Sequence, residues 1–376
     1  MHFAAHPFLE IDFPPIEGKR SGEAILIRTG RVDPWGKVLD SKVWLIDGGF
    51  IGTAEYILEF MKKYYGSTRI DYIIATHPDE DHIGGLIYLI DHADVRNLYI
   101  HKPSAYIGEL YIHIPLTYER EGHIRSLTAS LTKAANLIDR AEGKSIPVHE
   151  PFSYTYLAKK IETEDRFLRV YLLGPDEAYY NELLKEFRDY EKYVKEVRAF
   201  SERSPSLLED PPPDATTPEN NSSVILLFDF EGDYFLFTGD AGVPALEKAL
   251  NRFPGGYDKA RQVLLFKVPH HGSKNNLGPS LLNKAFGSLG MGKKCAIILA
   301  ATQDEDHPDE AVVSALRKRG FEVHANKDLN GKNYNQGWHL WFKSQYAPSR
   351  DSESWKELSS YKTSRYTLFR RHSPLS

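Results

Sequence analysis

The stretch THPDEDH, residues 76–82, places five side chains that can bind a metal ion within six consecutive positions. In an extended loop, residues i and i+2 project to the same side, so His77 and Asp79 can approach one ion. A turn can bring Asp81 and His82 around a second point. Imidazole suits zinc and similar ions, whereas carboxylates also suit harder cations. One short loop could therefore serve two adjacent metal ions.

The flanking sequence indicates how this loop is held. Residues 70–75 (IDYIIA) form a short β-branched run that is typical of a buried strand, and Gly84-Gly85 leads into an apolar helix expected over residues 86–90. The loop thus follows the carboxyl end of a strand. A solvated acidic loop is the alternative interpretation, but the whole pattern in this setting favours metal binding.

Two ions need further ligands and a bridge, and two later segments supply candidates. Asp240 follows the strand expected at residues 234–238, and its carboxylate has two oxygens that can span two cations. His270 and His271 follow the strand expected at residues 264–268. The simpler readings are a turn aspartate and a pair of loop histidines. All three clusters stand at strand ends, however, where loops gather into sites.

The composition sets the broad class of the protein. The chain has 376 residues, of which 41% are hydrophobic and 26% charged, as in ordinary globular proteins. No apolar run approaches the ~18 residues of a membrane helix, and the N-terminus lacks the pattern of a secretory signal. The single cysteine, Cys295, rules out an intrachain disulfide, and the net charge of −5 argues against a globally basic nucleic-acid coat. We expect a cytoplasmic protein without a membrane partner.

The chain outside these clusters predicts one large domain, residues 1–345. Residues 91–219 read as an enlarged insertion, whose proline-rich end, 204–219, predicts a linker or mobile loop instead of a packed element. Residues 346–376 form a basic tail, for which a solvated tail or surface helix is favoured over a polyanion-binding segment. Strands are also expected at 23–28, 42–47, 167–173, 223–230, 296–300, 321–324 and 338–342, and helices at 53–65, 127–141, 176–202 and 310–319.

These residues carry a resemblance to a known family. Residues 77–86 (HPDEDHIGGL) resemble the signature of the metallo-β-lactamase superfamily. The order His-x-Asp-x-Asp-His, in place of His-x-His-x-Asp-His, is similar to the branch typified by the hydrolase domain of the competence protein ComEC/Rec2. The resemblance covers about residues 20–345. Further matches follow in family order at residues 24–27, 45–49, 220–224, 236–240, 267–274 and 307–308.

The resemblance implies an α/β fold, an αββα four-layer sandwich with an inserted segment and a dinuclear site at one edge of its two sheets. His77 and Asp79 would hold one ion. Asp81, His82 and one of the two later histidines would hold the other, with Asp240 as the bridge. His271 is favoured as that ligand, and His270 as a supporting or phosphate-facing group.

Three departures from the family pattern stand out. Glu23 occupies a position where aspartate is commoner, a change that we expect to matter little. The third-motif histidine has no clear counterpart; Asp176 lies near that place in the chain, but its pattern does not mark it as a ligand. One ion would then be more weakly held. No membrane channel accompanies the domain, so we do not expect this chain to import DNA.

The expected mechanism uses two cations, Zn²⁺ or Mn²⁺, about 3.5–4 Å apart, to activate a shared water and to neutralise the substrate's charge. We assign catalytic roles to Asp79, Asp81 and His270, with Asp79, His270 or a water as the source of the leaving group's proton. Lys267 could contact phosphate, or it could be a strand residue that reaches water. Expected substrate-binding residues, with ordinary loop capping as the alternative, are Asn221, Ser222, Ser223, Ser273 and Lys274.

The sequence therefore predicts a metal-dependent hydrolase, first of all a phosphodiesterase or nuclease acting on nucleic acid or a nucleotide. The alternatives are hydrolysis of a non-nucleic ester or lactone, and a metal-binding regulatory module with a decayed site. As part of a larger assembly, the protein could use residues 91–219 as a lid or as a docking surface for a protein partner. A decorative surface insertion is the competing interpretation.

Overall fold

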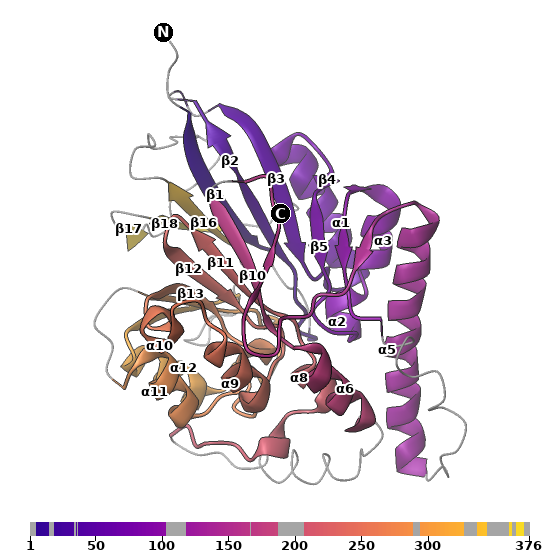
Figure 1. Ribbon diagram of the computed structural model, residues 1–376, viewed down its shortest axis with the longest axis vertical. Helices are drawn as coiled ribbons and strands as arrows, with labels where there is room; N and C mark the ends of the chain where they lie inside the picture. The colour runs from indigo at the N-terminus through magenta and orange to yellow at the C-terminus, as the bar shows by residue number, and fades with distance from the viewer. Residues whose placement is uncertain are drawn as a thin grey trace.

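Figure 1 presents the computed structural model of the chain. Its strands lie in two large sheets with helices on the outside. The structure describes residues 5–14, 19–33, 35, 37–102, 118–165, 167–186, 207–288, 294–326, 337–343, 361–362 and 366–371.

The first sheet has nine strands in the order β17-β18-β16-β1-β2-β3-β5-β7-β8. Strands β3, β5, β7 and β8 run parallel, so their carboxyl ends share one edge of the sheet. The strands are β1 (His6–Phe13), β2 (Ile25–Val32), β3 (Val38–Ile46), β5 (Tyr72–Ile74), β7 (Leu98–Tyr99), β8 (Val148–His149), β16 (Gly337–Lys343), β17 (Tyr361–Lys362) and β18 (Tyr366–Arg371). A separate pair joins β4 (Arg69–Ile70) to β6 (Asp94–Val95).

The second sheet has seven strands in the order β15-β14-β13-β12-β11-β10-β9. Strands β12 to β15 are parallel, and β9 to β12 are antiparallel. The strands are β9 (Lys159–Ile161), β10 (Leu168–Gly174), β11 (Ile225–Phe230), β12 (Asp233–Phe237), β13 (Val263–Lys267), β14 (Lys294–Ile298) and β15 (Phe321–Ala325).

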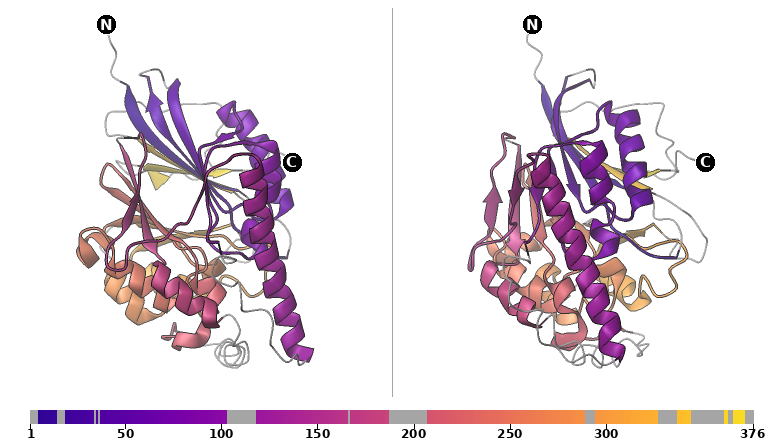
Figure 2. Two further views of the ribbon diagram at one scale, coloured as in Figure 1. Left: turned by 45° about the vertical axis from the view of Figure 1, so that its right-hand side comes forward. Right: turned by 90° about the vertical axis from the view of Figure 1, so that its right-hand side faces the viewer.

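The helices form the outer layers. Those beside the first sheet are α1 (Ile51–Phe60), which continues as the π-helix η1 (Met61–Tyr65), then α2 (Glu80–Ile83), α3 (Leu86–His92) and the long α5 (Tyr118–Gly143). Those beside the second sheet are α6 (Glu177–Glu186), α8 (Pro218–Asn221), α9 (Val243–Asn251), α10 (Gly256–Ala260), α11 (Pro279–Phe286) and α12 (Glu310–Lys318), with the 3-10 turns η2 (Pro213–Ala215) and η3 (His270–Gly272). Figure 2 shows the two helical layers on opposite sides of the sheets.

Three hydrophobic clusters hold the four layers together. The central cluster lies between the sheets, where Trp44 of β3 meets Phe228 of β11 edge to face with ring centroids 5.4 Å apart. A second cluster packs the first sheet against α1, α3 and α5. The third packs the second sheet against α6, α9, α11 and α12. The alternation of side chains along buried strands supplies both faces of each sheet. The predicted αββα sandwich is confirmed.

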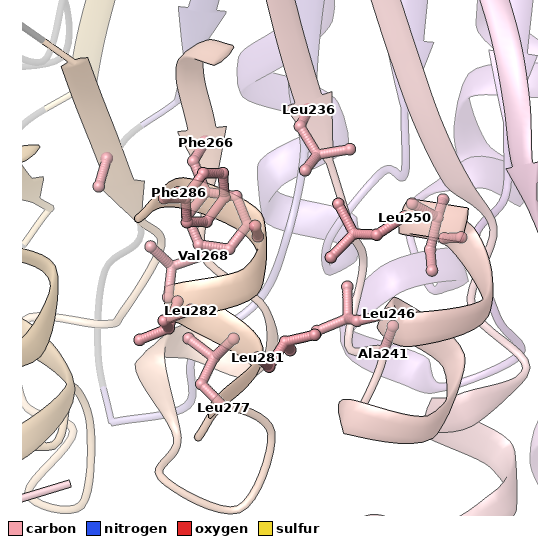
Figure 3. Packing of buried hydrophobic residues seen from close by; sticks show 14 of the residues in the cluster. Leu236, Ala241, Leu246, Leu250, Phe266, Val268, Leu277, Leu281, Leu282 and Phe286 are labelled. Carbon is pink, nitrogen blue, oxygen red and sulfur yellow. The ribbon is translucent and has the colours of Figure 1, made fainter. Parts of the chain in front are cut away.

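The third cluster shows why these segments form helices. Leu246 and Leu250 lie one turn apart on α9, and Leu281 and Leu282 come from α11. Figure 3 shows these side chains in one layer with Leu236 of β12 and Phe266 of β13, with Leu246 and Leu250 on the side of Leu236. Helical spacing thus places the apolar residues of each helix on the face toward the sheet.

A buried ion pair joins the first two strands. Arg28 of β2 forms an ion pair with Glu10 of β1, and their side chains are only 5% and 2% exposed. The guanidinium also lies over the Tyr65 ring, 4.0 Å from its centroid. This pair joins β2 to a strand that the sequence patterns did not mark, because residues 6–13 were not expected to form a strand.

Three expectations about the chain's organisation need correction or completion. The end of the expected linker is packed, since it contains η2 and the start of α8 and buries Ala215 and Glu219, whereas Leu207 is exposed. Within the expected basic tail, β17 and β18 join the first sheet beside β16. Residues 91–219 contribute β7 and β8 to the first sheet and β9 and β10 to the second, so part of the expected insertion belongs to the core. The helix expected to reach residue 202 lies outside the described residues beyond 186.

We expect Leu282→Ala to lower the free energy of unfolding by about 2–5 kcal/mol, because Leu282 is fully buried between α11 and the second sheet. Urea denaturation measures the change. Leu157→Ala is the matched control, since Leu157 is 68% exposed and its truncation should change stability by less than about 0.5 kcal/mol. Equal effects in the two variants would contradict the packing described here.

Candidate metal centre

Four strand ends meet where the two sheets come together. Asp47 follows β3 and His77 lies just after β5, both in the first sheet. Asp240 follows β12, and His271 follows β13, both in the second sheet. Parallel strands place these loops at a shared edge, as the sequence predicted. The three predicted clusters therefore converge on one site.

Glycines allow the loops to approach one another closely. A Cβ on Gly85 would lie 2.4 Å from the carbonyl oxygen of Gly48, and a Cβ on Gly48 would lie 2.6 Å from the Leu86 side chain. The Gly48 amide donates to the carbonyl of His82 at 2.7 Å. Because Gly48 and Gly85 lack side chains, the end of β3 packs directly against the segment that follows the THPDEDH loop.

Four candidate ligands form the tightest group. Asp81, His82, Asp240 and His271 each offer a ligand atom, and these atoms all lie within 4.8 Å of one another. His82 Nε2 lies 3.3 Å from Asp240 Oδ2 and 3.6 Å from Asp81 Oδ2. His271 Nε2 lies 3.3 Å from the same Asp81 oxygen. The set combines two imidazoles with two carboxylates, which suits a divalent transition metal.

The remaining two predicted ligands form a looser pair beside this group. His77 Nε2 lies 3.5 Å from Asp79 Oδ2, and the rings of His77 and His82 have centroids 4.1 Å apart. His77 is buried, whereas the Asp79 side chain is 38% exposed. This pair has fewer enclosing donors than the group of four.

The nitrogen atoms that face the centre fit a metal ion. Among the described residues, Nε2 of His77 and Nε2 of His82 are buried without a hydrogen-bond partner. An unsatisfied buried donor or acceptor is costly, and a cation would satisfy both atoms. The donor types and these two atoms therefore fit divalent cations.

The opposite ring nitrogens are held by the protein. Nδ1 of His82 lies 2.7 Å from Asp47 Oδ2, and Nδ1 of His271 lies 2.6 Å from the carbonyl oxygen of Leu299. Nδ1 of His77 lies 3.3 Å from the hydroxyl of Ser223. These partners orient the imidazoles so that each directs Nε2 to the centre.

Charge around His82 affects its protonation. Burial opposes the charged imidazolium, but the carboxylates of Asp240, Asp47 and Asp81 outweigh burial and raise the pKa of His82 well above its ordinary value. Burial likewise opposes ionisation of Asp240, but nearby His82 and His270 lower the pKa of Asp240 well below its usual range. The Asp240 carboxylate is thus kept ionised, as a metal ligand must be.

His270 stands in an unusual turn beside the four-ligand group. The φ angles of His270, His271 and Gly272 are 45°, 53° and 86°, all in the left-handed region that non-glycine residues rarely adopt. Nδ1 of His270 lies 3.1 Å from Asn276 Oδ1, and its Nε2 lies 3.9 Å from Asp240 Oδ2. The desolvation of its ring lowers the pKa of His270 to about 4. His271, not His270, belongs to the group of four.

The predicted substrate-binding residues lie close to the centre, but their polar groups have local partners. The Asn221 amide spans Gly242 N and Thr216 O, and the Ser222 hydroxyl donates to Glu219 O at 2.6 Å. Ser223 accepts from Asp240 N at 3.0 Å. Their contact with substrate stays a prediction.

The other two expected substrate contacts lie in the loop after His271. The Ser273 hydroxyl accepts from Asn275 N at 3.2 Å. The ammonium of Lys274 lies 3.5 Å from Asp309 Oδ2. Ser273 is buried, and only 12% of the Lys274 side chain is exposed. A contact between either residue and phosphate also stays a prediction.

Two residues near the predicted motifs have roles other than those considered. Asp176 forms a buried ion pair with Arg252 instead of joining the centre. Lys267 is completely buried and forms an ion pair with Glu23, so it neither reaches water nor offers an open face to phosphate. The strand pattern suggested only that the Lys267 side chain contacts phosphate or reaches water, and it gave no sign of the buried partner, Glu23.

Asp47 and His307 contact residues of the centre, although the sequence analysis gave neither of them a role. Asp47 accepts from the Thr76 hydroxyl at 2.6 Å as well as holding His82. The His307 ring stacks on His270 with centroids 5.7 Å apart, and its Nδ1 lies 3.2 Å from Asp304 Oδ2. An aspartate before Gly-Gly at a strand end was the available signal for Asp47.

The chain resembles known proteins in sequence and in structure. ComE operon protein 3 of Bacillus subtilis (strain 168) is 24% identical over 267 residues, which are 71% of this chain and 24% of that protein. The match thus spans about a quarter of the relative's length. A solved structure, the novel metallo hydrolase Igni18 from Ignicoccus hospitalis KIN4/I, matches with a TM-score of 0.36 and 10% identity, covering 84% of this chain and 94% of that one.

A family-level match covers most of the chain. The sequence model of the metallo-beta-lactamase superfamily matches residues 38–286, a range that includes the THPDEDH loop, Asp240 and both later histidines. No helix in the described ranges is both long and apolar enough to cross a membrane. With its sandwich fold and its convergent histidines and aspartates, the chain belongs to the metallo-beta-lactamase superfamily of metal-dependent hydrolases.

Proposed function

We propose that this protein is a phosphodiesterase or nuclease that uses two divalent cations, Zn²⁺ or Mn²⁺. The observation that carries the proposal is the convergence of three imidazoles and three carboxylates at one edge, with two buried nitrogens unsatisfied among the described residues. The ligand set is rich in carboxylate, which suits Mn²⁺ as well as Zn²⁺. Bound there, such ions supply Lewis-acid chemistry that activates water and neutralises a phosphodiester's charge.

The proposal assigns different residues to the two ions. Asp81, His82, Asp240 and His271 hold the more tightly bound ion, and His77 with Asp79 holds the other. Asp240 Oδ2 lies 3.3 Å from His82 Nε2, and Asp240 would serve as the bridge to the second ion through this oxygen, because Oδ1 accepts from the His270 amide.

Asp79 and His270 are the proposed contacts to the reacting phosphodiester. Their side chains are 38% and 31% exposed, whereas the His77, His82 and Asp240 side chains are at most 4% exposed. These two groups therefore have open surface beside the centre. Contact with the leaving oxygen needs such surface, and proton transfer needs hydrogen-bond reach.

The relative named above gives limited support. Its name states no substrate, and the match covers about a quarter of its length. Support for a phosphodiester substrate therefore comes from the carboxylate-rich ligand set and from the resemblance to the ComEC/Rec2 hydrolase domain.

Adding Zn²⁺ or Mn²⁺ to chelator-treated protein should raise its melting temperature, because an ion that binds only the folded state stabilises it by about 2.7 kcal/mol at 100 times its dissociation constant. Titration calorimetry should show two ions of unequal affinity, since four ligands enclose one position and two the other. Asp240→Ala should remove most of the shift. His92→Gln is the control, because His92 is exposed and bonded only to its own helix. A full shift in Asp240→Ala would refute the assigned centre.

Phosphodiester turnover tests the activity itself. With Mn²⁺ or Zn²⁺, the protein should cleave bis(p-nitrophenyl) phosphate and at least one of single-stranded DNA, duplex DNA, RNA or a cyclic nucleotide. Asp81→Ala should lower the rate by more than the about 10- to 100-fold typical of losing an outer partner of a ligand. His92→Gln should keep the rate. Cleavage that persists in Asp81→Ala points to a contaminant, and metal binding without turnover of any ester favours a regulatory module.

A further inference from the structure

A buried ion pair lies directly behind the candidate ligands. Lys267 is the last residue of β13, and Glu23 stands just before β2. The two side chains are ion-paired, and both are 0% exposed. Neither Glu23 oxygen has another hydrogen-bond partner among the described residues. The Glu23 carboxylate therefore depends on Lys267.

The pair connects the two halves of the site. The Lys267 ammonium donates to the carbonyl oxygen of Gly239 at 3.0 Å and lies 3.9 Å from Asp240 Oδ1. On the other side, the Glu23 amide donates to the carbonyl of Asp81 at 2.9 Å. One ion pair thus links the Asp240 loop of the second sheet to the Asp81 loop of the first.

Lys267 also distinguishes the two oxygens of Asp240. Oδ1 accepts from the His270 amide at 3.2 Å and faces the Lys267 ammonium. Oδ2 lies 3.3 Å from His82 Nε2, on the side of the candidate ligands. With Oδ1 held at the back, Asp240 presents Oδ2 to the centre.

We propose that Glu23 and Lys267 are positioning residues that hold Asp240 and the Asp81 loop in the geometry that binds the ions. The proposal rests on the metal binding that forms part of the proposed function, but it does not depend on the substrate. Glu23, whose departure from the family pattern was expected to matter little, thereby gains a specific role.

The energetics of burial favour this role over simple stabilisation. Two charges lose their hydration when buried, and an apolar pair of similar volume is often equally stable or more stable. A buried pair is therefore weak evidence for stability alone. Because its net charge is zero, it can orient Asp240 without adding net charge beside the cations.

The test compares two buried ion pairs in the same protein. The double variant Glu23→Gln with Lys267→Met removes the pair and leaves the net charge unchanged. Glu10→Gln with Arg28→Met does the same to the pair between β1 and β2, whose partners are not candidate ligands. Titration calorimetry with Zn²⁺ and with Mn²⁺ measures ion affinity, and circular dichroism with thermal unfolding measures folding.

We expect the first variant to bind the tighter ion about 10- to 100-fold more weakly, as is typical when outer partners of metal ligands are lost. The second variant should stay within about twofold of the wild type, whatever its loss of stability. Wild-type affinity in the first variant, or an equal loss in the second, overturns the proposal.

A milder change covers the case in which the double variant does not fold. Glu23→Asp keeps the charge but shortens the side chain by one methylene, which withdraws the carboxylate from Lys267. We expect affinity to fall several-fold in a folded protein, and unchanged affinity overturns the proposal. Since ion affinity is measured instead of turnover, a wrong phosphodiesterase assignment would leave this result interpretable.

Discussion

The fold depends on neutralising the carboxylates that its two sheets bring to one edge. Glu23, Asp47, Asp81 and Asp240 approach one another there, and three of the four are buried. Buried carboxylates repel one another and are stable only with cations or hydrogen-bond donors beside them. Lys267 pairs with Glu23, His82 lies between Asp47 and Asp240, and the proposed ions complete the balance.

The same requirement explains the hydrogen bonds around the centre. Every candidate histidine ligand is held through Nδ1, by Asp47, by Ser223 or by the carbonyl of Leu299. The ring orientations are therefore set before any ion binds, and less conformational freedom is lost on binding. Asp240 is fixed in a similar way by the amide of His270 and by Lys267. The protein thus supplies the orientation of the ligands, and a bound ion would supply the positive charge.

Much of this architecture was predictable from local patterns. The buried strand at 70–75, the Gly-Gly pairs and the three ligand clusters each carry a short-range signal, and parallel strand ends bring such clusters together. The four-layer sandwich followed from the resemblance. The predicted ligands do lie together, and their binding of ions stays a prediction.

Other features depend on long-range contacts that no local pattern encodes. Residues 6–13 become a strand because β2 and β16 pair with them on either side. The proline-rich segment before α8 packs because Thr216 donates to the carbonyl of Asn275. The partnership of Glu23 with Lys267 joins residues from different sheets. The proline-rich composition of residues 204–219 was recognised, but the partners of all these segments lie far away in the sequence.

The distribution of ligands between the sheets has a consequence for assembly. His77, Asp79, Asp81 and His82 come from the first sheet, and Asp240 and His271 from the second, so neither half contains a full set. An ion bound to ligands from both sheets would connect them, and its binding free energy would add to the stability of their packed arrangement. The return of β16 to pair with β1 joins a late segment of the chain to the first sheet. We therefore expect the protein to bind an ion at this site only after the two sheets have packed against each other, so that ion binding would report this step of folding.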